Sequence, residues 1–341
     1  MSEIFGQTNV LSCRWGSGSI DGLGRDLGRF VVATMDIPWQ LVKERLGATP
    51  AAVLLVESME REVLDKQLAT MPDCETVLAV GGGQAIDLGK YLAWQRGCRL
   101  VSVPTIISVD AFVTPKAAVR YQHRVEYVGQ ASPDPLVIDY DLIRTAPPEL
   151  NIAGVGDLLS IHTATFDWEL AHRAGRDDHK FSAEDVAQAR EILATVDQLA
   201  SEIRHVTDAG LRAIVDGYLR VNTICLPVDH YRAEEGSEHY LFYELEERLG
   251  RPFIHGHIVG LGIYLLSRLQ GNKPEWITEV MDRVGLSYQP ADMQIPRAAL
   301  VESLRSLKQF VRARKLWHTI IDEAEITDAW IDKALAGLRF A

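Results

Sequence analysis

Three short segments in the second half of the sequence contain side chains that could hold a metal ion. They are residues 154–159 (GVGDLL), 235–239 (EGSEH) and 253–260 (FIHGHIVG). One carboxylate and two imidazoles are an ordinary ligand set for a catalytic Zn²⁺ that keeps one position open for substrate. Because the segments lie far apart in the chain, a second interpretation stays open, in which each histidine is structural. A structural role is also assigned to His162, His172, His205 and His230, and His318 lies late in the chain and is isolated.

The segment from Val77 to Lys90, VLAVGGGQAIDLGK, has the composition of a phosphate-binding turn. Its first four residues are an apolar run typical of a strand buried on both faces, and a helical pattern follows the three glycines. Such a unit presents backbone N–H groups and a helix N-terminus to a phosphate, and glycine permits close approach to the main chain. A plain tight turn is the alternative. The segment lacks the GxGxxG fingerprint, so the usual dinucleotide template does not apply.

A polar loop, Ser102–Asp110 (SVPTIISVD), follows the strand expected at residues 100–103. Open α/β sheets bind ligands at the carboxyl ends of their parallel strands. Asp110 is therefore a candidate to hydrogen-bond a substrate hydroxyl, with an ordinary loop carboxylate as the alternative. Lys116, Arg120 and Arg124 follow at spacings of four residues. They form either a solvated helix face or a cationic patch for a substrate phosphate.

The bulk composition is that of an ordinary globular protein of 341 residues, with 47% hydrophobic and 24% charged residues. This length allows two domains and a large core. A net charge of −12 argues against nucleic acid as a general partner. The four cysteines contain no CxxC pair, which indicates a reducing, cytoplasmic location. We expect no signal peptide and no membrane span.

The pattern of apolar residues changes near residue 150. Before it, strands alternate with helices, which predicts a mostly parallel sheet covered on both faces. The expected strands are residues 29–34, 51–56, 77–80, 100–103 and 135–138. After Pro147-Pro148 the periodicity is helical nearly throughout, with a helix start at Ser182 and Asp185. Further helices are expected over 208–224, 237–249, 256–270, 275–284, 297–312 and 327–338. The prediction is an α/β domain over 1–150 and an all-helical domain over 151–341, and ligand sites favour the clefts between such domains.

Five motifs in order resemble the glycerol dehydrogenase and dehydroquinate synthase superfamily, which includes the iron-containing alcohol dehydrogenases. GGGQAIDLGK resembles the cofactor turn of that superfamily, and SVPTIISVDAF resembles its PTxxSxDA loop. GVGDLLSIHTATFDWELAHR is most similar to the sn-glycerol-1-phosphate dehydrogenase branch. GSEH and HGHIVGLG resemble the two histidine-bearing segments. The resemblance implies a dehydroquinate synthase-like fold, with an N-terminal Rossmann-like domain and an all-α C-terminal domain.

The resemblance also implies a metal and a dinucleotide. The metal is usually Zn²⁺, with Fe²⁺ or Ni²⁺ as alternatives, and its implied ligands are Asp157, His239 and His255. The implied cofactor is NAD, with NADP as the alternative, and its implied contacts are Asp36, Gly81, Gly82, Gly83, Asp87, Thr105 and Ser108. Asp36 matches an acid on the adenine ribose, which favours NAD because a 2′-phosphate would meet a like charge. Relatives are commonly homo-oligomers.

The resemblance implies that Asp110, Lys116 and Tyr243 act on the substrate, and Tyr243 and His257 depart from the pattern of related enzymes. Asp110 matches the aspartate that contacts a polyol. Tyr243 stands where related enzymes have a second histidine, and a tyrosine is a poorer base at neutral pH. His257 stands where glutamate or glutamine is usual. Lys116 lies six residues beyond Asp110, the spacing of the aspartate and lysine in dehydroquinate synthases.

Three functions follow from these features. The first is an NAD-linked, metal-dependent dehydrogenase of a small polyol or its phosphate, nearest to sn-glycerol-1-phosphate dehydrogenase. The second is a sugar-phosphate cyclase, a lyase that Lys116 favours, whereas Asp157 stands where cyclases usually carry glutamate. The third is a silent relative that binds nucleotide without metal, which the retained ligand triad disfavours. For the enzymes, the partner is a small molecule.

Overall fold

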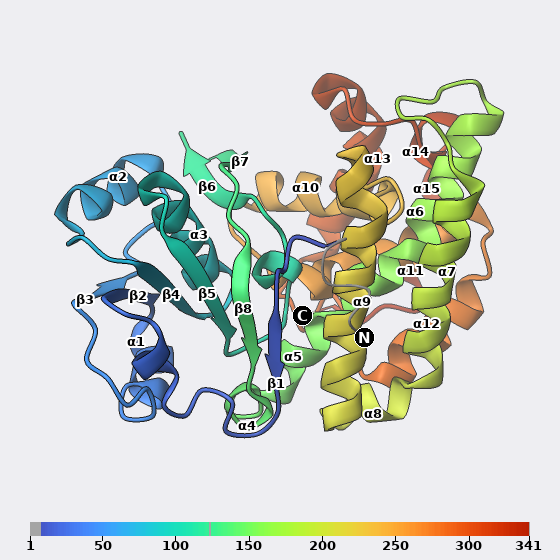
Figure 1. The fold of residues 1–341 in the computed structure, drawn as a ribbon. Coiled ribbons are helices and arrows are strands. Elements are labelled where there is room, and N and C mark those ends of the chain that lie inside the picture. The colour runs from blue at the N-terminus through green and yellow to red at the C-terminus, as the bar shows by residue number, and fades with distance from the viewer. Residues whose placement is uncertain (1–7, 123, 341) are drawn as a thin grey trace. The chain divides into compact units, whose positions relative to one another are not determined.

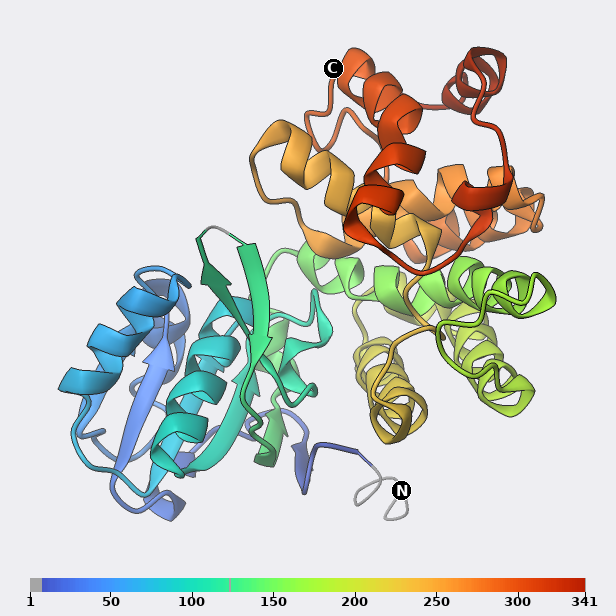
Figure 2. The same ribbon diagram turned by 90° about the horizontal axis from the view of Figure 1, so that it is seen from above.

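The computed structural model describes residues 8–122 and 124–340. By its internal contacts the chain divides into two compact units, Met1–Asn151 and Ile152–Ala341. The first unit contains all the strands found in the described residues, and the second consists of helices and loops (Figures 1 and 2). Each unit is treated separately below.

The first unit is built on a six-stranded sheet in the order β1-β8-β5-β4-β2-β3. All five pairings are parallel, so the prediction of a mostly parallel sheet is confirmed. The strands are β1 (Cys13–Trp15), β2 (Phe30–Thr34), β3 (Ala52–Leu55), β4 (Thr76–Gly81), β5 (Arg99–Pro104) and β8 (Pro133–Ile138). Five of them match the expected strands. The edge strand β1 was not expected, because three residues are too short to show a period.

Helices cover both faces of this sheet, as predicted. On one face, Val32, Leu78 and Val101 belong to a buried cluster with residues of the short helices η1 (Leu23–Asp26), α1 (Asp36–Val42) and α4 (Tyr140–Ile143). On the other face lies α3 (Gly83–Arg96), where a side chain on Gly89 would overlap Ala79 of β4. Neighbouring strand residues point to opposite faces, so the near-continuous apolar runs of β2, β4 and β5 follow from this double burial.

The sequence PWQLVKERLG predicts a helix that starts at Pro38 and that Gly47 terminates, and the observed helix differs at both ends. It begins at Asp36 and ends at Val42, so Pro38 is its third residue. The first four N–H groups of a helix have no partner inside the helix, so proline costs no hydrogen bond there. The other helices of this unit are α2 (Arg61–Thr70), the 3₁₀ turn η2 (Asp110–Phe112) and α5 (Pro148–Ala153), the last of which runs across the division between the units.

Of the two interpretations of Lys116, Arg120 and Arg124, the helix face is wrong and the cationic patch stays a prediction. This stretch forms an antiparallel ribbon of β6 (Ala117–Tyr121) and β7 (Arg124–Val128). The sequence signal is an alternation of two residues, with Val119, Tyr121, Val125 and Tyr127 separated by polar residues. A spacing of four fits a strand as well as a helix, so the charges alone do not distinguish the two.

The second unit consists of helices, as the periodicity after residue 150 predicted. They are α6 (Val155–Arg173), α7 (Ala183–Gln198), α8 (Ala200–Arg204), α9 (Asp208–Cys225), η3 (Leu226–Val228), α10 (Ser237–Leu249), α11 (His255–Gln270), α12 (Pro274–Val284), α13 (Arg297–Arg314), α14 (Ile320–Glu323) and α15 (Asp328–Leu335). The helix start at Ser182 is confirmed, since its hydroxyl accepts a hydrogen bond from the N–H of Asp185. Among the described residues, every helix is too short or too polar to cross a bilayer.

Candidate functional site

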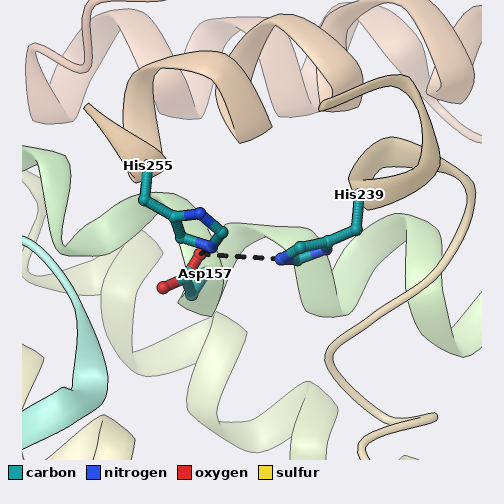
Figure 3. Close-up of side chains that lie close together, drawn as sticks. All are labelled: Asp157, His239 and His255. Carbon is teal, nitrogen blue, oxygen red and sulfur yellow. Dashed lines mark ion pairs between the residues drawn. The ribbon is translucent and has the colours of Figure 1, made fainter. Parts of the chain in front are cut away.

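Three side chains from three helices of the second unit meet at one point (Figure 3). Asp157 lies in the first turn of α6, His239 in the first turn of α10, and His255 is the first residue of α11. One carboxylate oxygen and two imidazole nitrogens lie within 4.8 Å of one another. The Oδ1 atom of Asp157 is 3.1 Å from Nε2 of His255 and 3.9 Å from Nε2 of His239. The structure therefore brings together the three ligands that the resemblance implied.

Glycines bring the three helices close enough for this convergence. A Cβ on Gly156 would lie 2.5 Å from the Cα of Gly256, and a Cβ on Gly256 would overlap the carbonyl oxygen of Ala153. The start of α11 therefore packs directly on the backbone at the start of α6. Further along α11, a Cβ on Gly262 would lie 2.5 Å from the carbonyl oxygen of Glu238. The absence of side chains at these positions lets backbones touch, which sets the positions of Asp157, His239 and His255.

A buried carboxylate on α6 determines where α10 begins. Asp167 accepts hydrogen bonds from the backbone N–H of Ser237 at 2.9 Å and from that of Ile320 at 2.9 Å. It thereby satisfies N–H groups at the starts of α10 and α14. Burial and the nearby Glu238 raise the pKa of Asp167 to about 6. Because α6 carries both Asp157 and Asp167, one rigid helix positions the carboxylate and the start of the helix that carries His239.

The two imidazoles and the aspartate stabilise each other's charged forms. Burial by itself would raise the pKa of Asp157, but His255 and His239 outweigh this effect and lower it. Burial would lower the pKa of His239, but its hydrogen bond to Glu238 and the carboxylates of Glu235 and Glu238 raise it to about 9. On the other side, the hydroxyl of Tyr218 lies 3.4 Å from Oδ2 of Asp157 and donates to the carbonyl of Gly154.

The chemistry of this donor set fits a divalent cation. Carboxylates of Asp157, Glu235 and Glu238 all act electrostatically on His239, so carboxylates outnumber the two imidazoles of the site, and burial raises the pKa of Glu235. His239 and Asp157 are almost fully buried, where unbalanced charge is costly. Tetrahedral zinc sites take imidazole nitrogen and carboxylate oxygen, and three protein ligands leave one position for substrate. Of these carboxylates, the sequence interpretation gave Glu235 and Glu238 no role, although both lie in the segment EEGSEH.

Tyr243 and His257 lie beside this triad. Tyr243 is half-buried, one turn after His239 on α10, with the two ring centroids 6.4 Å apart. His257 is buried two residues after His255 on α11. Their assignment to the substrate side stays a prediction.

In the first unit, the glycine turn and the polar loop pack against each other. The N–H of Thr105 donates to the carbonyl of Gly81 at 3.0 Å. A Cβ on Gly82 would lie 2.8 Å from Cδ1 of Ile106, and one on Gly83 would lie 3.2 Å from Cγ1 of Val109. Gly81 has φ +147°, a conformation that favours glycine. The two segments implied to bind the cofactor, with Ser108 half-buried between Ile106 and Val109, are thus adjacent.

This turn leaves the N-terminus of α3 suited to a phosphate. Gly82 caps the helix without a side-chain hydrogen bond, and the first turn contains no acidic residue. Backbone N–H groups at the start of a 14-residue helix are therefore free of side-chain caps and of a competing carboxylate. Asp36 is exposed in the first turn of α1. It lies two residues before Pro38, whose Cγ would be 3.6 Å from a Cβ on Gly81.

Asp87 is a buried residue of α3. Its carboxylate forms a buried ion pair with Lys90 at 2.7 Å, and the ammonium of Lys90 also donates to the carbonyl of Lys116 at 2.6 Å. This pair ties α3 to the start of β6. The structure thus gives Asp87 a packing role, and its cofactor role stays a prediction.

The structure places Asp110 and Lys116 on the same connection after β5. Asp110 begins the turn η2 and is half-buried, whereas the side chain of Lys116 is exposed just before β6. The N–H of Ile107 donates to the side chain of Asn151 at 3.2 Å, which anchors the loop before Asp110. The substrate roles of Asp110 and Lys116 stay predictions.

The histidines assigned to the structural class have partners away from the triad. His162 contacts the carbonyl of Asn272 at 2.6 Å, and His172 contacts Asp177 at 2.7 Å. His230 accepts a hydrogen bond at Nδ1 from the N–H of Arg232 and stacks on His179 with centroids 4.3 Å apart. These contacts are those of satisfied structural side chains.

Comparisons with known proteins agree with the resemblance. A family model described as iron-containing alcohol dehydrogenase matches residues 34–147. The glycerol-1-phosphate dehydrogenase (NAD(P)+) of Staphylothermus marinus is 30% identical over 259 residues, covering 74% of this chain and 71% of that protein. The chain belongs to the iron-containing alcohol dehydrogenase family. The enzyme of the same name from Hyperthermus butylicus is 28% identical and aligns over 92% of both chains, so this member of the family matches such relatives along nearly its whole length.

Solved structures confirm the predicted fold of this iron-containing alcohol dehydrogenase family member. A probable glycerol dehydrogenase from Sinorhizobium meliloti superposes with a TM-score of 0.68 at 21% identity, over 95% of each chain. An iron-containing alcohol dehydrogenase from Corynebacterium glutamicum has a TM-score of 0.71 at 15% identity, over 96% of this chain and 94% of that one. At these identities the likeness establishes the fold alone.

The Gly156–Gly256 contact yields a first prediction. The new Cβ of Gly256→Ala would overlap the carbonyl oxygen of Ala153, the last residue of α5, so α11 must shift. We expect a loss of about 3 kcal/mol in the free energy of unfolding, the upper end for overpacking. The amount of metal bound after zinc loading should fall together with the stability. The control is Gly260→Ala on the same helix, whose new Cβ would meet the end of the Leu286 side chain at 3.0 Å. Urea denaturation and metal analysis measure both effects, and equal stability of the two variants would contradict the packing argument.

His230 yields a prediction about pH. Burial, His179 and Arg232 lower the pKa of His230 from 6.5 to about 4, against the opposing charges of Asp185 and Asp229. Below pH 6.5 the unfolded chain binds the proton first, so stability is lost as the pH falls from about 6.5 to about 4. His230→Asn keeps an acceptor for Arg232 and should reduce the loss between pH 7 and 5 by about 1 kcal/mol. Urea titrations at both pH values test this, with His205→Asn at an exposed position as the control.

Proposed function

We propose that this chain is an NAD(P)-linked, metal-dependent dehydrogenase that interconverts a polyol phosphate and its ketone. The nearest analogue is the pair sn-glycerol 1-phosphate and dihydroxyacetone phosphate. The observation that carries the proposal is the convergence of Asp157, His239 and His255, in a chain whose relatives are named glycerol-1-phosphate dehydrogenases. The family and the triad together support a redox reaction at a metal-activated hydroxyl.

The second unit, proposed as the metal and substrate domain, would hold the cation through Asp157, His239 and His255. We propose Zn²⁺, since imidazole and carboxylate suit it, while Fe²⁺ and Ni²⁺ accept similar ligands. When bound, the cation would act as Lewis acid on the substrate oxygen and the nicotinamide would exchange the hydride. Asp157 and His239 hold their positions before any ligand arrives because α6 and α10 fix them.

The first unit, proposed as the dinucleotide-binding domain, would hold the cofactor. Its pyrophosphate would lie at Gly81, Gly82 and Gly83, where the N-terminus of α3 favours negative charge. Thr105 and Ser108 would line the adjoining loop. The exposed carboxylate of Asp36 would accept from the adenine ribose, which favours NAD over NADP.

Three residues are proposed to act on the substrate. Asp110 would orient a hydroxyl by accepting its hydrogen bond, and Lys116, as an exposed cation, would bind the phosphate as a point charge. Tyr243, one turn from His239, would hold or move a proton at its phenolic oxygen. These roles come from the family resemblance.

The cyclase alternative rests on the spacing of Asp110 and Lys116. The relatives that match most of this chain are named as dehydrogenases, which favours the dehydrogenase. A homo-oligomeric state and a cytoplasmic location complete the proposal. The family resemblance supports the first, and the scattered cysteines, which contain no CxxC pair, support the second.

His255→Ala tests the metal site. The variant loses one of three ligands, so we expect stoichiometric metal binding to disappear and turnover to fall by more than about 100-fold. This loss is larger than the usual effect of removing a residue that only contacts a metal ligand. Metal analysis after zinc loading and initial rates measure both. His205→Ala, at an exposed position, should retain metal and rate. Full activity of the His255 variant would contradict the assignment.

A substrate panel tests the reaction. Zinc-loaded protein is incubated with polyols, polyol phosphates, sugar phosphates and hydroxy acids, with NAD and with NADP. We expect net NADH formation with a polyol phosphate and no release of inorganic phosphate, because a dehydrogenase leaves the phosphate ester intact. Phosphate release without net NADH would instead establish the cyclase.

A further inference from the structure

Glu238 is the residue before the proposed ligand His239, and its side chain is completely buried. Its Oε1 atom lies 2.8 Å from Nδ1 of His239, on the side of the ring opposite Nε2. The same oxygen accepts the backbone N–H of Gly236 at 2.6 Å. One carboxylate oxygen thus contacts both the loop before α10 and the imidazole that faces Asp157.

This contact determines which nitrogen of His239 carries the proton. A carboxylate accepts hydrogen bonds and does not donate them, so Nδ1 must be the donor. In the neutral ring the lone pair is then on Nε2, the nitrogen that lies 3.9 Å from Oδ1 of Asp157. This tautomer is the one in which Nε2 of His239 can bind a metal ion.

The backbone around Glu238 leaves this side chain little freedom. A Cβ on Gly236 would lie 2.8 Å from the Cα of Ala164, 2.9 Å from Oδ2 of Asp167 and 3.1 Å from Oε2 of Glu238. On the opposite side, α11 approaches the carbonyl of Glu238 at Gly262. Glu238 is thus packed between α6 and α11, and its Oε2 is buried without a hydrogen-bond donor among the described residues.

An uncompensated buried carboxylate oxygen is costly unless positive charge lies nearby. A divalent cation on Nε2 of His239 would supply such charge through the imidazole. Carboxylates that accept from the far nitrogen of a metal-bound histidine fix its orientation and increase its basicity. A cation in the site would therefore compensate the buried charge of Glu238.

We propose that Glu238 is a positioning residue of the metal centre, which fixes the tautomer and orientation of His239 and strengthens it as a ligand. This inference rests on the proposed metal site. A purely structural Glu238 would instead serve only to accept the N–H of Gly236. The two roles differ in their need for negative charge, because a neutral amide oxygen can also accept that N–H.

Glu238→Gln separates the two roles. It keeps the length and an acceptor oxygen but removes the charge. The matched control is Glu244→Gln, a buried glutamate on the same helix that accepts from Arg248 and Ser306. Glu238→Asp keeps the charge but has a shorter side chain, which moves the carboxylate away from Nδ1 of His239. This variant replaces Glu238→Gln in the test if the glutamine variant fails to fold. Circular dichroism and urea denaturation of the metal-free proteins establish folding.

The measurement is metal affinity, from competition of Zn²⁺ with a chromophoric chelator, together with the visible spectrum of the Co²⁺-loaded protein. We expect Glu238→Gln and Glu238→Asp to weaken Zn²⁺ binding by roughly 10–100-fold and to alter the Co²⁺ spectrum. Glu244→Gln should leave both unchanged. Wild-type affinity and an unchanged spectrum in a folded Glu238 variant would overturn the inference while leaving the proposed function intact. Wild-type protein that binds no metal would instead overturn the proposed function.

Discussion

The backbone contact between Gly156 and Gly256 is the constraint on which the candidate metal centre depends. Helices with ordinary side chains at their contact lie 8–10 Å apart, whereas backbones that touch come closer. Here the start of α11 lies against the start of α6, so Asp157 and His255, each within one residue of a contacting glycine, are brought face to face. Gly262 does the same between α11 and α10. The ligand geometry is thus a consequence of helix packing.

Asp167 and Glu238 add buried polar contacts to this helix packing. Asp167 supplies the acceptor that the start of α10 needs, and Glu238 supplies the acceptor that His239 needs. Both are buried carboxylates, and both would be unfavourable in isolation. Glu238, together with Asp157 and Glu235, concentrates negative charge around His239. A bound cation offers the simplest compensation, which links the electrostatics of the whole cluster to the proposed chemistry.

The first unit uses glycine in a comparable way for a different purpose. At Gly82 and Gly83 the missing side chains let the loop at Ile106 and Val109 lie against the turn, and at Gly89 they let α3 pack on β4. The helix N-terminus is thereby held open to a ligand. The buried pair of Asp87 and Lys90 then joins α3 to the β6–β7 ribbon. Cofactor binding and the placement of the following loop thus share one helix.

The sequence by itself determined the elements and the types of side chain at the site. Apolar periodicity and helix caps are local signals, so the strands around residues 77–80 and 100–103 and the helix over 237–249 were predictable. The motif resemblance also identified Asp157, His239 and His255. Local signals were weaker for β1, which is too short, and for Arg120 and Arg124, whose spacing fits either a helix or a strand. Only the tertiary structure decided that the three ligands converge and that Lys90 reaches the carbonyl of Lys116. Those contacts depend on how closely segments distant in the chain approach one another, and at the triad this distance is set by packing at glycines rather than by any local preference.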